Sequence, residues 1–143
     1  MIYSKMAEHA IAALAELARQ PKGERVATAR IADAASIPRP MLTKVVAELQ
    51  HAGFVKTREG RHGGVRLVDR TGGISIREVA NAFDADVSLP LCPFHRDGCD
   101  CEGRNPCKAH ALWIEAREAF ERFLDRVTIA DVSEAAPRPR KKK

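Results

Sequence analysis

The spacing of hydrophobic residues changes at Gly53, from a helical repeat before it to a strand-like repeat after it. Residues 40–51 carry apolar side chains three or four positions apart, which is typical of the buried face of a helix. Residues 54–58 and 65–68 flank the sequence GRHGG, whose glycines permit the positive φ angles of a tight hairpin. A shorter predicted helix, residues 29–34, comes before the connection SIPRP. Two short helices, a tight turn and a basic hairpin are the parts of a winged helix-turn-helix.

Two residues mark the expected starts of the helices in this motif. Thr28 has the side chain of a helix cap and is predicted to open the first of them. Pro40 suits the first position of the second helix, where its missing N–H costs nothing.

Four further helices are predicted around the motif. Residues 3–20 carry an apolar stripe at helical spacing. Residues 75–83 open with the serine and glutamate of a capping box. The longest predicted helix begins at Asn105-Pro106 and runs for roughly 22 residues, and Thr128 caps a last short one. The fold class expected is therefore mainly α with a small β wing.

The positive charge of the chain is unevenly distributed. The net charge is +5, and the five basic side chains of the tail account for all of it. Residues 20–70 hold ten basic and five acidic side chains, whereas residues 71–137 hold seven and twelve. An anionic partner is expected to bind the first region.

Double-stranded DNA is the partner that this charge and this motif favour together. In a winged helix-turn-helix the second helix lies in the major groove, and the hairpin reaches the neighbouring backbone. An ordinary solvated surface would also carry some of these charges, but here they converge on the helix and the hairpin that such motifs present to DNA. The residues predicted to contact an operator are Thr28, Arg39, Pro40, Met41, Thr43, Lys44, Lys56, Arg58, Arg61, His62 and Arg66.

Every cysteine of the chain falls within residues 91–113. They are Cys92, Cys99, Cys101 and Cys107, and the segment also holds His95 and His110. Thiolates and imidazoles gathered this densely are soft metal ligands. The segment is also rich in Gly, Asp, Arg and Pro, so it has little apolar material with which to hold its own shape.

The residues of this segment leave three chemistries open. An iron–sulfur cluster needs thiolates, and one weaker ligand makes it more labile, as suits a sensor. Zinc accepts three cysteines and a histidine, but its sites usually contain a C-x2–4-C pair, and Cys99-Asp100-Cys101 is tighter than that. A metal-free thiol switch is the third alternative.

The order of these parts resembles the winged-helix iron–sulfur transcription regulators that include IscR, NsrR and RirA. The resemblance covers nearly the whole chain, and it rests on TARIADAASIPRPMLTKVVAELQHAGFV, the wing EGRHGGVRL, and GISIREVANAF. The most specific match is CEGRNPCKAHALW, followed by FLDRVTIADV. It implies a homodimeric regulator whose DNA binding responds to an Fe–S cluster, which is favoured over zinc.

The resemblance also implies a ligand set. The thiolate ligands would be Cys92, Cys101 and Cys107. Cys99 is an alternative for the middle position. His110 corresponds to the histidine of IscR and favours a 2Fe–2S cluster. Glu8 stands where NsrR has an aspartate that reaches a 4Fe–4S cluster from the partner subunit, so it is the alternative fourth ligand.

Four parts are expected along the chain. Residues 1–83 form the winged helix-turn-helix DNA-binding domain, and residues 84–107 form the cysteine-rich cluster-binding loop. Residues 105–135 form a long C-terminal dimerisation helix and a short terminal helix, because a helix of this length after a complete small domain is expected to pack against its twin. Residues 136–143 are a basic, disordered tail.

Other classes of protein are disfavoured by the sequence. No glycine-rich phosphate loop and no nucleophile–base pairing is evident, so an enzyme is not expected. No apolar run reaches membrane-spanning length and no signal peptide is recognisable. A cytoplasmic location is therefore expected, where thiols stay reduced and metal binding outranks structural disulfides.

Overall fold

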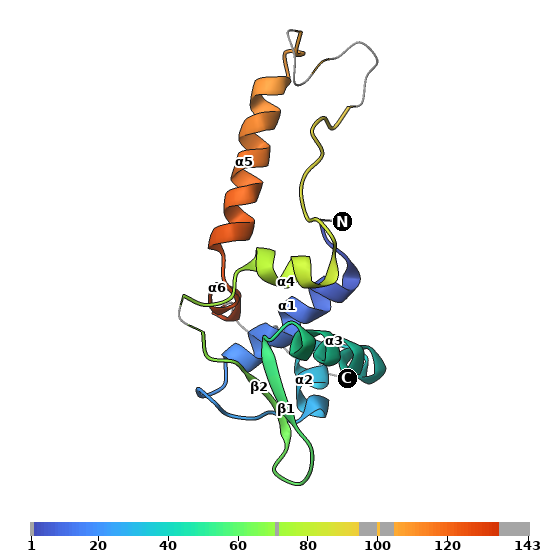
Figure 1. Ribbon diagram of the computed structural model, residues 1–143, viewed down its shortest axis with the longest axis vertical. Coiled ribbons are helices and arrows are strands. Elements are labelled where there is room, and N and C mark those ends of the chain that lie inside the picture. Colours follow the sequence, from blue (N-terminus) through green and yellow to red (C-terminus); the bar gives the residue numbers. More distant parts are fainter. Residues whose placement is uncertain (1, 71, 95–99, 101–104, 135–143) are drawn as a thin grey trace, which may run out of the picture.

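The computed structural model describes residues 2–70, 72–94, 100 and 105–134. Its elements, in chain order (Figure 1), are α1 (Lys5–Ala18), α2 (Thr28–Ala35), α3 (Arg39–His51), β1 (Val55–Arg58), β2 (Gly64–Leu67), α4 (Ile76–Phe83), α5 (His110–Arg126) and α6 (Ile129–Ser133). Over the described residues the chain is thus mainly helical, with one antiparallel pair of strands, as the sequence predicted. None of the described helices is long and apolar enough to cross a membrane.

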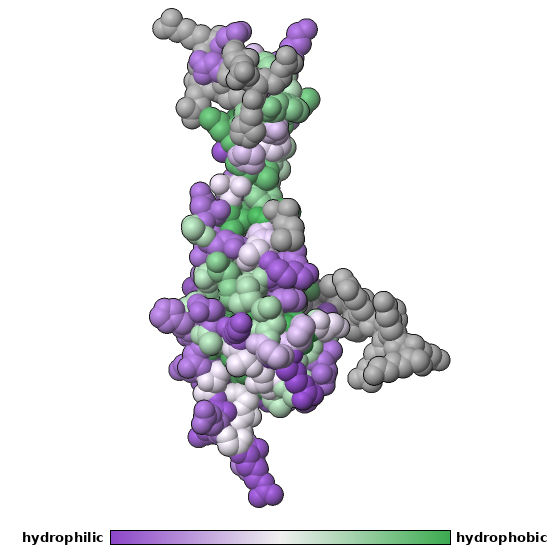
Figure 2. All heavy atoms as spheres, turned by 90° about the vertical axis from the view of Figure 1, so that its right-hand side faces the viewer, coloured by the Kyte–Doolittle hydropathy of each residue, from purple (hydrophilic) through white to green (hydrophobic). Residues whose placement is uncertain are grey.

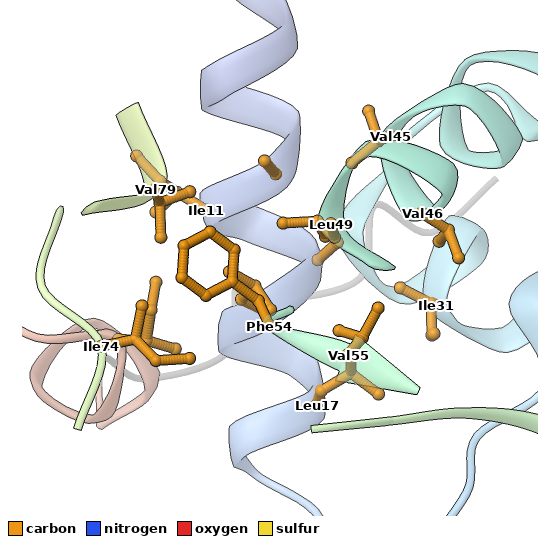
Figure 3. Packing of buried hydrophobic residues seen from close by; sticks show 14 of the residues in the cluster. Ile11, Leu17, Ile31, Val45, Val46, Leu49, Phe54, Val55, Ile74 and Val79 are labelled. Atoms are coloured by element: carbon orange, nitrogen blue, oxygen red, sulfur yellow. The ribbon is translucent and has the colours of Figure 1, made fainter. Parts of the chain in front are cut away.

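Helix α1 runs through the middle of the body and packs against α2, α3, α4 and α6. Figure 3 shows Ile11 and Leu17 of α1 in one cluster with Leu49 of α3, Phe54 and Ile74. Burying a large apolar side chain of this kind contributes about 1.5–3 kcal/mol. The predicted apolar stripe of residues 3–20 is therefore the centre of the core, and the other elements are arranged around it.

Helices α2 and α3 form the predicted helix-turn-helix, with two differences at their starts. Ser36 ends α2 in the left-handed region at φ 55°. The cap of α2 is Ala27 and it makes no side-chain cap bond, so the prediction that Thr28 caps this helix is wrong: Thr28 is already its first residue. Helix α3 begins at Arg39 rather than at Pro40, which therefore takes the second helical position. A proline is tolerated there because the first N–H groups of a helix have no intrahelical acceptor.

The hairpin has the predicted place, shifted by one residue at three of its four strand ends. Val55 pairs with Leu67, and Arg58 pairs with Gly64. Residue Val26, which precedes α2, forms a bridge with Val65, with N···O distances of 2.8 Å in both directions. The hairpin is thereby tied to the helix-turn-helix by backbone hydrogen bonds, and its orientation is set by the body.

Helix α4 starts as predicted, whereas α5 starts later. The Ser75 side chain accepts from the Glu78 N–H, and the Glu78 carboxylate accepts from the Ser75 N–H, which lowers the pKa of Glu78. An equivalent reciprocal pair, Thr128 and Asp131, opens α6. Asn105-Pro106 does not open α5: the helix begins at His110 and has 17 residues, not roughly 22. Its cap position is Ala109, without a side-chain cap bond.

Helix α5 rises from the body as a stalk (Figure 1). Its buried residue is Leu124, near the C-terminal end, which packs into the core. Further along the stalk Leu112 is 71% exposed, and Phe123 beside the base is 42% exposed. Figure 2 shows hydrophobic surface along the stalk, above a largely hydrophilic body. An exposed apolar helix face of this kind marks a contact with another surface.

Candidate functional site

The predicted DNA contacts on α3 form one exposed face. Arg39, Pro40, Thr43 and Lys44 are all exposed, on the side opposite to the buried residues of the helix. Met41 differs from the others because it is half-buried and packs on the core. The described residues on this face thus place two cations and a hydroxyl toward solvent, which is the pattern of a helix that reads a groove.

Two of these side chains have partners within the protein. Arg39 Nη2 lies 3.8 Å from Asp33 Oδ2, and both side chains are more than two-thirds exposed. An exposed pair at this distance is weak, so it leaves Arg39 available to a phosphate or a base. Thr43 Oγ1 donates to the Arg39 carbonyl oxygen at 3.1 Å.

The wing concentrates positive charge. Lys56 and Arg66 are directly opposite each other in the hairpin register. Like charges in such a pair destabilise a sheet, so their presence indicates a use other than stability. The remaining predicted wing contacts are exposed at the end of β1 and in the loop: Arg58, Arg61 and His62.

Arg25 supports the wing and was missed by the sequence analysis. Its Nη1 donates to the carbonyl oxygens of Lys56 at 3.3 Å and Gly64 at 3.4 Å, one in each strand. Thr28, the remaining predicted contact, is half-buried at the start of α2, three residues further along. No sequence pattern signals the role of Arg25, because it depends on how the hairpin folds back on the segment before α2.

The cysteine site is described in part. Cys92 is half-buried and Cys107 is exposed, whereas Cys99 and Cys101 lie outside the described residues. The His110 N–H donates to the Cys107 carbonyl oxygen at 3.0 Å, so the two residues share one turn at the far end of α5. His110 Nδ1 is buried and has no hydrogen-bond partner among the residues that the structure describes.

Trp113 brings the Cys92 segment to the same end of α5. Its Nε1–H lies 3.0 Å from both the Pro90 and the Leu91 carbonyl oxygens, so the indole is placed to donate to them. Trp113 is three residues beyond His110 and therefore on the same side of the helix. The C-x2-H-x2-W spacing contained this signal, but the sequence analysis did not assign the indole a task.

Within the part of the chain that the structure describes, no three His, Cys, Asp or Glu side chains are grouped closely enough to hold a metal. Glu8, the alternative ligand, lies in the first turn of α1, on the body, whereas Cys107 and His110 are at the far end of the stalk (Figure 1). Lys5 Nζ donates to Glu8 Oε2 at 2.7 Å and lowers the pKa of that carboxyl. In a single protomer Glu8 is therefore an ionised surface group paired with Lys5.

Comparisons with known proteins agree with this architecture. A family model described as Rrf2, iron-dependent transcriptional regulator, matches residues 3–135. The HTH-type transcriptional regulator NsrR of Geobacillus kaustophilus is 36% identical over 127 residues, which cover 89% of this chain and 86% of that protein. The regulator IscR of Klebsiella pneumoniae is 27% identical over 124 residues, covering 87% and 74%. The solved structure of CymR, the global cysteine regulator of B. subtilis, superposes with a TM-score of 0.69 at 25% identity, covering 91% of this chain and 94% of that one.

Proposed function

The chain belongs to the Rrf2 family of transcriptional regulators, and from this premise we propose that it is a homodimeric DNA-binding regulator whose operator affinity is controlled by an iron–sulfur cluster. DNA binding and a non-enzymatic role follow from the family, as the sequence analysis predicted. The observation that carries the cluster proposal is the meeting of Cys107, His110 and the segment next to Cys92 at one end of α5.

The operator would be read by α3 in the major groove and by the wing beside it. Arg39, Lys44 and the four wing cations would be the side chains available in each subunit for phosphate or base contacts. Among the predicted contact residues, the exposed ones support this mode of DNA binding. Met41, which is half-buried, would support the position of α3 rather than touch a base.

The second subunit is proposed to cover the exposed apolar side of the stalk. Leu112 and Phe123 are large hydrophobic side chains left in solvent by a single chain. Burying apolar surface at about 25 cal/mol per Å² would favour pairing of two stalks. Two reading helices related by a two-fold axis would then meet half-sites about one helical turn apart.

The proposed ligands are Cys92, Cys101, Cys107 and His110, with Cys99 and Glu8 as alternates. The donor set fits an Fe–S cluster because thiolates are its preferred ligands, and because the buried His110 Nδ1 is left without a hydrogen-bond partner by the described part of the chain. His110 as fourth ligand favours 2Fe–2S over 4Fe–4S, and Glu8 would first have to leave Lys5. When bound, such a cluster would supply a redox- and ligand-sensitive link between the two cysteine segments.

A metal-free thiol switch is the second candidate. It is favoured by the likeness to CymR, which is described as a global cysteine regulator. Cys107 is exposed, as a reactive thiol must be. The two candidates differ in a direct observable, because only the cluster gives purified protein visible absorption and bound iron. A structural zinc site would give colourless protein with stoichiometric zinc.

Titrating operator DNA against the cluster-bound and the cluster-free protein tests the proposal. The two forms are expected to differ in operator affinity by about tenfold, which is about 1.4 kcal/mol of coupling. Both forms should bind scrambled DNA equally weakly. The slope of log affinity against log salt should be near −5, for about six neutralised phosphates. Equal operator affinities, or binding as a monomer, would contradict the proposal.

Trp113→Phe should make the cluster more labile while leaving the fold intact. The substitution keeps an aromatic ring but removes the Nε1–H that lies 3.0 Å from the Pro90 and Leu91 carbonyl oxygens. Groups that orient the ligands of a metal centre typically contribute 10- to 100-fold to its retention, so loss of visible absorption in excess chelator should be about tenfold faster. Identical loss rates in the variant and the wild type would show that the indole does not position Cys92.

A further inference from the structure

The base of the stalk is held by contacts near the C-terminal end of α5. Leu124 is the buried residue of α5. Two backbone hydrogen bonds flank it, from the Ile76 N–H to the Val127 carbonyl oxygen and from the Ile129 N–H to the Ile74 carbonyl oxygen, both 2.9 Å long. These contacts hold the end of α5 in place. Partly buried hydrophobic residues on either side of Leu124 pack on the same core, but apolar contacts are not directional, so they do not by themselves fix the direction in which the rest of the helix points.

Arg77 provides the directional contact at this junction. It lies in the first turn of α4, and its guanidinium donates to the carboxylates of Glu121 and Asp125, as well as to the Glu121 carbonyl oxygen at 3.5 Å. Glu121 and Asp125 are one helical turn apart on the same side of α5. A planar guanidinium that holds two carboxylates one turn apart opposes both tilting and rotation of that helix.

The ion pairs of Arg77 with Glu121 and Asp125 connect the body of the molecule with the helix that leads to the cysteine site. Arg77 belongs to α4, whose Val79 and Ala80 lie in the same core as α1 and α3. Glu121 and Asp125 belong to the helix that carries His110 at its other end. The Arg77 side chain is 25% exposed and Glu121 is 38% exposed, so their attraction is less screened than that of a fully solvated pair.

We propose that Arg77 is the positioning residue that fixes the direction in which α5 leaves the DNA-reading body. The direction of α5 in turn determines how strongly operator affinity differs between the cluster-bound and the cluster-free protein. The second half of this inference rests on the proposed function. The first half concerns only the packing of α4 against α5 and holds whether or not a cluster is present.

Arg77→Met tests the inference, because methionine keeps an apolar stem and removes the guanidinium. Arg70→Met is the matched control. Arg70 also pairs with a carboxylate of α4, Glu78, at 2.8 Å, but this pair does not involve α5. Both variants remove one positive charge, so a difference between them reports the link to α5 and not the change in net charge. A second variant, Glu121→Gln with Asp125→Asn, removes the two acceptor charges and leaves Arg77 in place.

The first readout uses cluster-free protein and needs no DNA. Hydrogen exchange of the Ile76 and Ile129 amides reports opening at the base of α5, because Ile76 of α4 donates to Val127 at the end of α5 and Ile129, just after it, donates to Ile74. Exchange at these two amides should be about tenfold faster in Arg77→Met and in the Glu121/Asp125 double variant. It should be unchanged in Arg70→Met. If the exchange rates of both Arg77→Met and the Glu121/Asp125 double variant stay at the wild-type values, Arg77 has no positioning role.

The second readout is the ratio of operator affinities between the cluster-bound and cluster-free forms. This ratio should fall from about tenfold in wild type to below about twofold in Arg77→Met and should stay near wild type in Arg70→Met. If the wild-type protein binds the operator equally well with and without the cluster, the proposed function is refuted. The amide exchange rates would still decide whether Arg77 positions α5. A ratio that stays at about tenfold in Arg77→Met would refute the regulatory half of the inference.

Discussion

Gly64→Ala is expected to abolish specific DNA binding, with a loss of operator affinity on the order of 100-fold, because it removes the wing as an ordered contact. Gly64 has a φ of +130°, and a Cβ atom there would lie 2.6 Å from the Val26 carbonyl oxygen and 2.8 Å from its carbonyl carbon. Both atoms are backbone, so neither can turn aside. The bridge between Val26 and Val65 must therefore open, and Arg66 moves with it.

Gly60→Ala is the matched control for this prediction. Gly60 also has a positive φ, +97°, but nothing lies within 4 Å of its Cβ position. The backbone strain alone should cost about 1–2 kcal/mol of stability, with a much smaller loss of operator affinity. Gel-shift titrations of both variants against operator and scrambled DNA measure the difference. Equal losses would mean that strain in the loop, rather than the contact with Val26, decides the result.

Replacing Cys107 with alanine is expected to abolish cluster assembly altogether. Cys92→Ala and Cys101→Ala should do the same, whereas Cys99→Ala should keep most of the cluster. An Fe–S cluster held by three thiolates and one weaker ligand does not tolerate loss of a thiolate. Visible absorption and iron content after anaerobic purification measure the outcome. If Cys99→Ala loses the cluster and Cys101→Ala keeps it, Cys99 is the middle ligand.

The fourth ligand is decided by a second pair of variants. His110→Ala should make the cluster labile or change its visible spectrum, and Glu8→Ala should leave both unchanged. The opposite outcome would assign the position to Glu8, which must then leave its 2.7 Å pair with Lys5 to reach a cysteine site on the other subunit.

Reciprocal capping pairs were the part of the fold that could be predicted from sequence, whereas the single cap expected at Thr28 was wrong. Ser75 with Glu78 and Thr128 with Asp131 were expected to open helices, and both form complete capping boxes. Such pairs involve residues three apart, so they do not depend on the rest of the chain. The hairpin was predictable for the same reason, since glycines set its turn.

Features that depend on distant partners were not predictable. The helix expected from Asn105-Pro106 starts at His110, after a turn that the His110 N–H closes on the Cys107 carbonyl oxygen. The tasks of Arg25, Arg77 and Trp113 follow from segments that are 22 to 48 positions away in sequence. An isolated arginine or tryptophan gives no sign of such a partner. The cysteine site was recognisable by its residue types, but its ligand set remains a prediction because Cys99 and Cys101 lie outside the described residues.

In the described part of the chain, helix α5 is held to the body only near its C-terminal end, by Leu124 in the core and by the ion pairs of Arg77, so its other end lies at the tip of a long arm. From Leu124 to His110 the helix is about 21 Å long at 1.5 Å per residue. A displacement of about 4 Å at the cysteine end therefore corresponds to about 10° of rotation at the base of the helix. Successive base pairs of DNA are turned by about 35° relative to one another. With Arg77 holding α5 rigidly on the body, rearrangement of the cysteine site would turn the reading helix through a similarly small angle, which adjusts its fit within a groove without moving it to a different register.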